Sequence, residues 1–297
     1  MKRINLLLLF AICSIAVLSA IAQKPAAKPT RSIIFAVLSD GKSLEPIAYV
    51  DKTKLEPPAN GSDEQSIVAA FNKIYYKPGT VYKLIFGGAT AGTVTVKSSD
   101  SKAECSKNVG TATTASTKTQ LKGLVMGLAT NATVKTVAGY RRKPTAAEKE
   151  EIETLVKAEF VKQKLTPKVL RYQNLTALDV DGDGKADLVG SYWIEIDKTT
   201  RGLLFFIASK GSNGKYAFGY KEYRSIDQSN VMSGDIKSVD DGVLHELLLD
   251  AFDYDGDGTA EIFTYVQSFE GAGFNVYHRD GTKWTRAFEG ANYHCGY

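Results

Sequence analysis

The sequence predicts a mainly β protein with a few helices, in which an N-terminal α+β or β-rich domain precedes two similar four-stranded units. A nine-residue segment at 179–187 recurs at 253–261, and six of its nine positions are identical. Runs rich in β-branched and aromatic residues flank both segments, and Gly/Asp clusters bound these runs, which is typical of hairpins. Two helix-start patterns lie before residue 149.

The first 22 residues are typical of a secretory signal. The basic residues Lys2 and Arg3 precede an apolar stretch over 6–18, and the small residues Ala20 and Ala22 mark a cleavage site. The sequence therefore predicts a secreted or periplasmic protein.

Two alternatives to a cleaved signal remain open. The apolar stretch is nearly long enough for an uncleaved membrane anchor. Cys13 would suit a lipoprotein, but Ile12 stands before it where a small residue is expected. If the signal is cleaved, residues 23–31 form a short leader, and no further apolar segment predicts a membrane span.

Charge and cysteine content limit the function classes. Cleavage leaves 275 residues (297 − 22), enough for one large or two modest domains. Removing Lys2 and Arg3 from the 37 basic residues leaves 35 against 33 acidic ones, with no basic stripe, so we expect no nucleic-acid partner. Cys105 and Cys295 then remain, and in an exported chain they predict one disulfide, with two separate thiols as the alternative.

Residues 32–141 are expected to form the N-terminal α+β domain, for which no family motif is evident. Strands are predicted at 32–39 and 47–50. A helix is predicted over 63–75, because a capping-box pattern opens it at Ser62 and three apolar residues follow at helical spacing. Those three residues are Ile67, Phe71 and Ile74.

A Gly-rich segment at 87–91 separates two further predicted strands, at 81–86 and 92–97. Such a segment can bind phosphate, but this one lacks the Lys-Ser/Thr ending of a P-loop, so a hairpin turn is favoured over an anion site. Residues 110–118 are rich in Thr, Ala and Ser and are predicted to be an exposed loop.

The clearest helix lies in the connecting segment 142–166. Thr145 is followed three residues later by Glu148, which predicts a capping box. The helix is expected to run to about Lys164 and to end before Pro167. Its apolar stripe consists of Ile152, Leu155, Val156 and Phe160.

The two repeated segments, named here the first loop (179–187) and the second loop (253–261), each place acids at positions 1, 3, 5 and 9 and glycines at 4 and 6. Two unit charges 4 Å apart repel by about 4 kcal/mol at an effective dielectric near 20, so such a cluster favours a bound cation. All-oxygen ligands indicate a hard cation, calcium first. An EF-hand is excluded, because its position 12 would fall on Gly190 or Thr264 where a Glu is required.

The spacing Asp-x-Asp-Gly-Asp-Gly-x-x-Asp/Glu, followed by an apolar pair, resembles the FG-GAP and VCBS type of repeat over residues 168–297. The resemblance implies four-stranded propeller blades with calcium in the loop between the first two strands. Gly184 and Gly258 would permit the sharp turn. The ligands it implies are the side chains of Asp179, Asp181, Asp183, Asp187, Asp253, Asp255, Asp257 and Glu261 and the carbonyls of Lys185 and Thr259.

Each unit, within residues 167–297, is predicted to contain four strands at a period of 74 residues (253 − 179). Two blades cannot close a propeller, which needs four to eight. The rest of the core must therefore come from the N-terminal half or from a partner. The strands are predicted around 175–178, 188–194, 203–208 and 216–220, and around 247–252, 262–266, 274–277 and Trp284.

No catalytic constellation is evident, because the chain lacks a Gly-x-Ser-x-Gly motif and has only three histidines. His278 and His294 are interpreted as surface polar residues. The first hypothesis is thus an exported, non-catalytic calcium-binding protein for interaction or adhesion, with an extracellular protein or glycan as partner. The second is a secreted hydrolase of glycans or esters in which calcium is structural.

Overall fold

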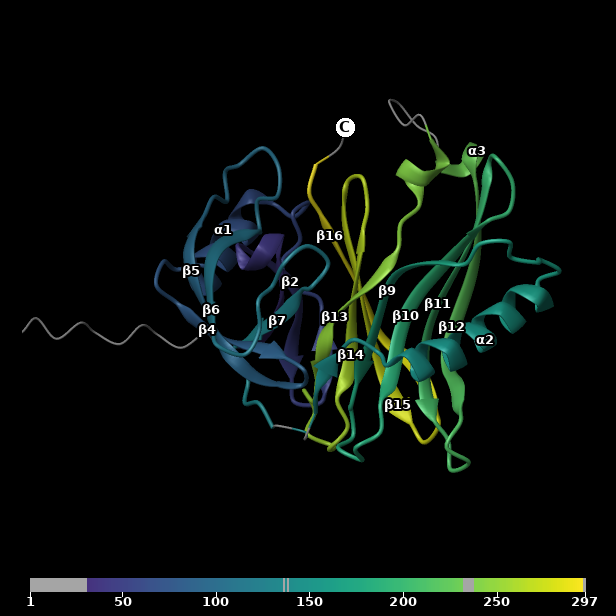
Figure 1. Cartoon of the computed structure of the whole chain (residues 1–297). Coiled ribbons are helices and arrows are strands. Elements are labelled where there is room, and N and C mark those ends of the chain that lie inside the picture. Colours follow the sequence, from purple (N-terminus) through teal and green to yellow (C-terminus); the bar gives the residue numbers. More distant parts are fainter. Residues whose placement is uncertain (1–30, 136, 138, 232–237, 296–297) are drawn as a thin grey trace, which may run out of the picture.

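The computed structural model describes residues 31–135, 137, 139–231 and 238–295, so the predicted signal and all of the leader except Arg31 lie outside it. These residues fold mainly into β-strands, with three α-helices, as predicted. Figure 1 shows a barrel at one side, two neighbouring sheets and a long helix on the far side. None of the helices in this part of the chain is long and apolar enough to cross a membrane.

The N-terminal part forms a six-stranded barrel, because the sheet order β1-β7-β4-β5-β6-β2 is closed by pairing of β2 with β1. On β1, Ile33, Phe35 and Val37 join a core made of barrel strands, α1 and their loops. Alternate residues point the other way. The barrel strands are β1 (Ser32–Leu38), β2 (Ser43–Asp51), β4 (Val81–Phe86), β5 (Ala89–Ser99), β6 (Gly110–Ser116) and β7 (Gly127–Thr130), and β3 (Lys54–Glu56) extends β2.

The prediction of an exposed loop at 110–118 is wrong, because most of this segment is strand β6. This strand pairs with β5 along seven residues and with β2 at Ser43 and Leu44, and so closes the barrel. Only Gly110 and Ala112 of β6 are buried. The segment therefore carries almost no hydrophobic signal, and pairing with strands that are distant in the chain decides its structure.

The predicted first helix is present as α1 (Gln65–Tyr75), but its start and its buried face differ from the prediction. Ser62 does not cap it, because the Ser62 N–H and hydroxyl both donate to the Asn60 side chain at 3.1 Å. Ile67 and Ile74 are 48% and 44% exposed. The buried residues are Val68, Phe71, Asn72 and Tyr75.

Two antiparallel sheets follow the barrel, each containing a four-strand meander. The first sheet has the order β12-β11-β10-β9-β8 and the second sheet the order β13-β14-β15-β16. The first sheet consists of β8 (Arg141–Arg142), β9 (Arg171–Leu178), β10 (Asp187–Glu195), β11 (Thr200–Lys210) and β12 (Tyr216–Asp227). The second consists of β13 (Glu246–Phe252), β14 (Glu261–Gln267), β15 (Gly271–Asp280) and β16 (Lys283–Tyr293). The short helices are η1 (Ser39–Gly41), α3 (Gln228–Val231) and η2 (Val239–Gly242).

The second sheet is buried on both faces, which places it between the barrel and the first sheet (Figure 1). On one face, Leu249 and Phe263 pack with Ile34 of the barrel. On the other face, Ile262 and Tyr277 pack with residues of the first sheet. The prediction that the repeated units do not complete their own core is confirmed, and the barrel supplies the missing part.

The long helix α2 (Ala146–Lys162) covers the outer face of the first sheet. It begins with the predicted capping box: the Glu148 N–H donates to the Thr145 hydroxyl at 3.2 Å, and the Thr145 N–H donates to the Glu148 carboxylate at 2.8 Å. Ile152, Val156 and Phe160 are fully buried in the core shared with the first sheet. The predicted apolar stripe is therefore confirmed at these three positions.

A buried ionic contact joins the Gly-rich turn of the barrel to both sheets. The N–H groups of Gly87 and Gly88 donate to the Asp250 carboxylate on β13 at 3.1 and 3.0 Å. Arg141 on β8 also contacts Asp250, with 2.8 Å between Nη1 and Oδ2, and both side chains are almost inaccessible. The N–H groups of the 87–88 turn thus bind an anion, and that anion is the Asp250 carboxylate of the same chain.

The end of β16 is linked to the barrel by a cysteine pair and by hydrogen bonds. Cys105 and Cys295 lie at bonding distance with their Cα atoms 4.9 Å apart, as the disulfide prediction requires. Next to them, the buried carboxylate of Glu45 accepts from Asn292 Nδ2 at 2.8 Å and contacts His294 Nε2 at 2.6 Å. His294 is therefore more than the surface polar residue expected, because it forms a hydrogen bond with a buried acid.

We expect the contribution of His294 to stability to depend on pH. The Glu45 carboxylate raises the pKa of His294 above its ordinary 6.5. The contact therefore stabilises the fold fully below about pH 6.5 and is lost as pH rises through the raised folded-state pKa. The melting temperature of His294→Gln should lie well below wild type at pH 6 and close to it at pH 9. A gap that stays constant between these pH values would contradict this assignment.

Candidate metal centre

The two acidic loops lie side by side, each at the tip of a hairpin. The first loop joins β9 to β10 and the second joins β13 to β14. The Ala260 N–H of the second loop donates to the Val180 carbonyl of the first at 2.7 Å. The sequence predicted the two hairpins separately, but their direct contact follows from the packing of the two sheets.

The loops share one backbone conformation. The first acid of each accepts N–H groups from the two loop glycines: Asp179 from Gly182 at 2.8 Å and Gly184 at 3.2 Å, and Asp253 from Gly256 at 2.6 Å and Gly258 at 3.1 Å. All four glycines have positive φ between 72° and 98°, a region that side chains rarely tolerate. The predicted role of glycine at position 6 is confirmed, and position 4 shares it.

The equivalence extends to the other acids. The third position accepts the N–H of the fifth, and the fifth accepts the N–H of the seventh, in both loops. The ninth position accepts the N–H of the second in both, at Asp187 and at Glu261. Two chain segments with only six identical residues thus adopt the same closed turn with the same pattern of hydrogen bonds.

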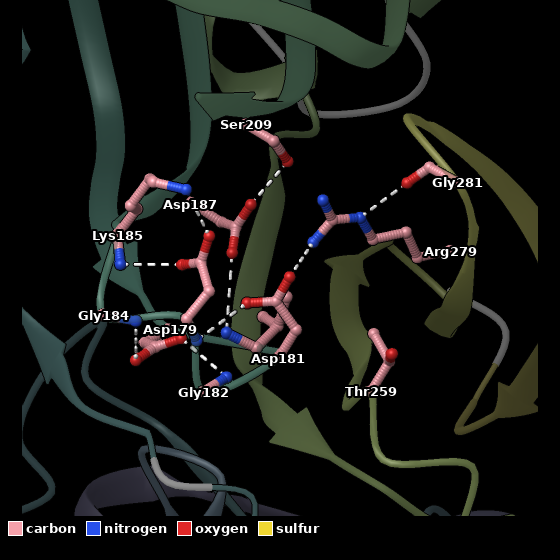
Figure 2. A network of polar contacts seen from close by, with 12 residues as sticks. Asp179, Asp181, Gly182, Gly184, Lys185, Asp187, Ser209, Thr259, Arg279 and Gly281 are labelled. Atoms are coloured by element: carbon pink, nitrogen blue, oxygen red, sulfur yellow. Dashed lines mark hydrogen bonds and ion pairs between the residues drawn. The ribbon is translucent and has the colours of Figure 1, made fainter. Parts of the chain in front are cut away.

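In the first loop, three of the four predicted side-chain ligands come together. Carboxylate oxygens of Asp179, Asp181 and Asp183 lie within 4.8 Å of one another. Asp187 lies outside this group and contacts the Ser209 hydroxyl through a short hydrogen bond (Figure 2). Burial raises the pKa of Asp187 to about 6, which the Ser209 hydrogen bond opposes.

A small cavity of about 10 Å³ lies beside these acids, between Asp181, Asp183 and Asp187 and the side chains of Ser209 and Arg279. A volume of this size matches one water-sized occupant. The space beside the carboxylates is therefore large enough for a single ion.

Two cationic side chains contact the first loop. Lys185 Nζ lies 2.9 Å from Asp183 Oδ2, and this hydrogen bond lowers the pKa of Asp183. Arg279, from β15 of the second sheet, places Nη1 2.7 Å from Asp181 Oδ2 (Figure 2). The Lys185 side chain is exposed, whereas that of Arg279 is mostly buried. The first loop is thus partly neutralised by the protein itself.

In the second loop, the acids gather around a histidine. Ligand atoms of Asp255, Asp257, Glu261 and His278 lie within 4.8 Å of one another, and Asp253 is outside this group. His278 Nδ1 is 3.0 Å from Glu261 Oε1. Burial raises the pKa of Glu261, whose contact in turn raises the pKa of His278.

The sequence interpretation of His278 as an ordinary surface residue is therefore incomplete. His278 and Arg279 are neighbours on β15, and successive side chains of a strand point to opposite faces. One reaches the second loop and the other reaches the first. Both lie outside the repeated nine-residue segments. Pairing of β15 with β14 could have indicated His278, whereas the contact of Arg279 with the first loop depends on the packing of the two sheets.

The donor atoms fit a hard divalent cation. The first loop offers carboxylate and hydroxyl oxygens, and the second offers carboxylates with one imidazole at the edge. Lys185 is exposed and Thr259 is half-buried, at the loop position where the resemblance implies carbonyl ligands.

Comparison of the chain with protein-family models, with curated proteins and with solved structures gave no match.

Proposed function

We propose that this protein is an exported, non-catalytic calcium-binding protein that takes one Ca²⁺ ion in each acidic loop and serves in interaction or adhesion. The observation that carries the proposal is the hydrogen-bonded turn that the two loops share, with three carboxylates gathered in each. Three carboxylates within 4.8 Å of one another in each loop repel unless cations are present. A turn alone requires none of them, because Asp-Gly pairs form hairpins without further acids.

Two further features support an FG-GAP/VCBS-like role. Each loop joins the first two strands of a four-strand antiparallel meander, which is the position that the resemblance implies for the ion. The bridged cysteine pair, together with the predicted signal, supports export to an oxidising compartment with abundant calcium. Calcium modules in such compartments have dissociation constants of about 0.1–1 mM.

Calcium should therefore raise the melting temperature, and chelator should lower it, because an ion that binds only the folded state stabilises it by mass action. At a concentration 100 times the dissociation constant, one site contributes about 2.7 kcal/mol. Asp181→Ala and Asp255→Ala should each remove part of this response, and the double substitution most of it. Magnesium should substitute poorly, because it requires a tighter octahedral shell.

The control for this experiment is Asp51→Ala, which removes an exposed carboxylate of β2 far from both loops in sequence. Its response to calcium should equal that of wild type. If protein shown to be metal-free melts at the same temperature with calcium and with chelator, the calcium proposal is wrong. An activity screen against glycans, esters and peptides tests the proposal that the protein is not a catalyst. Robust turnover that is lost on substitution of residues outside the loops would overturn it.

A further inference from the structure

The two loops differ in how much positive charge the protein already places on them. Four acids with Lys185 and Arg279 leave a formal charge of −2 at the first loop (−4 + 2), counting the contacts of the described residues. The second loop has Thr259 in place of Lys185, and in the described part of the chain no Lys or Arg side chain forms an ion pair with its acids. Lys135 Nζ instead donates to the Gly256 carbonyl of this loop at 3.2 Å. With Lys135 counted and His278 neutral, its formal charge is −3 (−4 + 1).

Arg279 is held in place from two sides. Its Nε donates to the Gly281 carbonyl at 2.9 Å, while Nη1 contacts Asp181 at 2.7 Å. The guanidinium carbon lies 6.0 Å from the ring centre of the buried Trp284. The side chains of Arg279 and Asp181 are only 18% and 26% exposed, so water screens this pair far less than it screens Lys185 and Asp183.

We propose that Arg279 is a tethered counter-ion of the first loop, whose positive charge opposes calcium, so that the first loop binds calcium more weakly than the second. This inference rests on the proposed calcium binding. The guanidinium places a positive charge 2.7 Å from Asp181 Oδ2, which repels a cation bound by the same carboxylate. Calcium affinity also rises with the number of uncompensated carboxylates, which favours the second loop. The second loop would then fill first, and the first would fill only at higher calcium concentration.

The test is calorimetric titration of calcium into metal-free mature protein. The calcium affinity of each loop is measured separately, in a variant whose other loop is disabled. Asp255→Ala/Asp257→Ala leaves the first loop, and Asp181→Ala/Asp183→Ala leaves the second. We expect weaker binding in the first of these proteins. Adding Arg279→Gln to it should tighten binding about tenfold, the size expected for loss of one competing charge-assisted hydrogen bond. Arg279→Lys should give a smaller gain, because the charge remains without the planar fork.

The matched control is Arg171→Gln, which removes one positive charge from the opposite end of β9. It accounts for the general effect of net charge, and it should change first-loop affinity much less than Arg279→Gln does. If calcium binds but Arg279→Gln and Arg171→Gln act equally, or if the first loop binds more tightly, this inference is wrong and the calcium proposal stands. If neither loop binds calcium in any of the proteins, both fail.

Discussion

Asp250→Ala should destabilise the protein by about 3–5 kcal/mol, the range for removing one partner of a buried ion pair. The Asp250 carboxylate is fully buried and accepts hydrogen bonds from Gly87, Gly88 and Arg141. Its loss removes this acceptor from the Arg141 guanidinium and from the N–H groups of Gly87, Gly88 and Ala251. Urea unfolding of the calcium-loaded protein measures the effect as a lower midpoint.

A double-mutant cycle with Arg141→Met separates the ion pair from the general cost of substitution. Arg141 Nη1 also donates to the Met126 and Leu249 carbonyls, so Arg141→Met alone should be harmful as well. The double variant should lose clearly less stability than the sum of the two single variants, because no buried charge is then left unpaired. Strict additivity, or a loss as small as that of the exposed control Asp51→Ala, would contradict the role assigned to this contact.

Replacing both Cys105 and Cys295 by serine should remove about 5 kcal/mol of stability, the chain-entropy estimate for a crosslink that closes a loop of this length. The two residues are 190 apart in sequence, so the bond restricts most of the mature chain in the unfolded state. We expect a lower urea midpoint for the serine variant and for reduced wild type. Both measurements should be made at saturating calcium, so that metal binding does not vary.

Reductant provides the internal control for this prediction, because it should not affect the serine variant further. Mass spectrometry of the unreduced mature protein tests the bond directly. Two free thiols in the folded protein would contradict it. The neighbouring hydrogen bonds from Asn108 to Asn292 and from Ser106 to the His294 carbonyl should keep the end of β16 near the barrel even when the bond is absent.

Several elements were predictable because short-range patterns decide them. The capping box of α2 and its apolar stripe lie within one helix. The acidic loops are equally local, because each forms its turn from nine consecutive residues. Their flanking strands are marked by β-branched and aromatic residues. A single sequence contains everything that such features require.

Other elements failed because the deciding partners are far apart in the chain. Strand β6 carries little hydrophobic signal and exists because β5 and β2 pair with it. The buried face of α1 was misassigned because the barrel, and not the spacing of isoleucines alone, selects which side packs. The turn at Gly87 was predicted, but its anion, Asp250, lies 163 residues further along.

The sequence by itself determined the acidic turns, the long helix and the mainly β character of this protein, since local spacing and side-chain type are sufficient for these. Only the tertiary structure decided that the barrel closes and that the second sheet is buried on both faces. It also brought His278 and Arg279 to different loops. Strand pairing and the alternation of β15 make that choice, and a change of register by one residue would exchange the faces that these two side chains occupy.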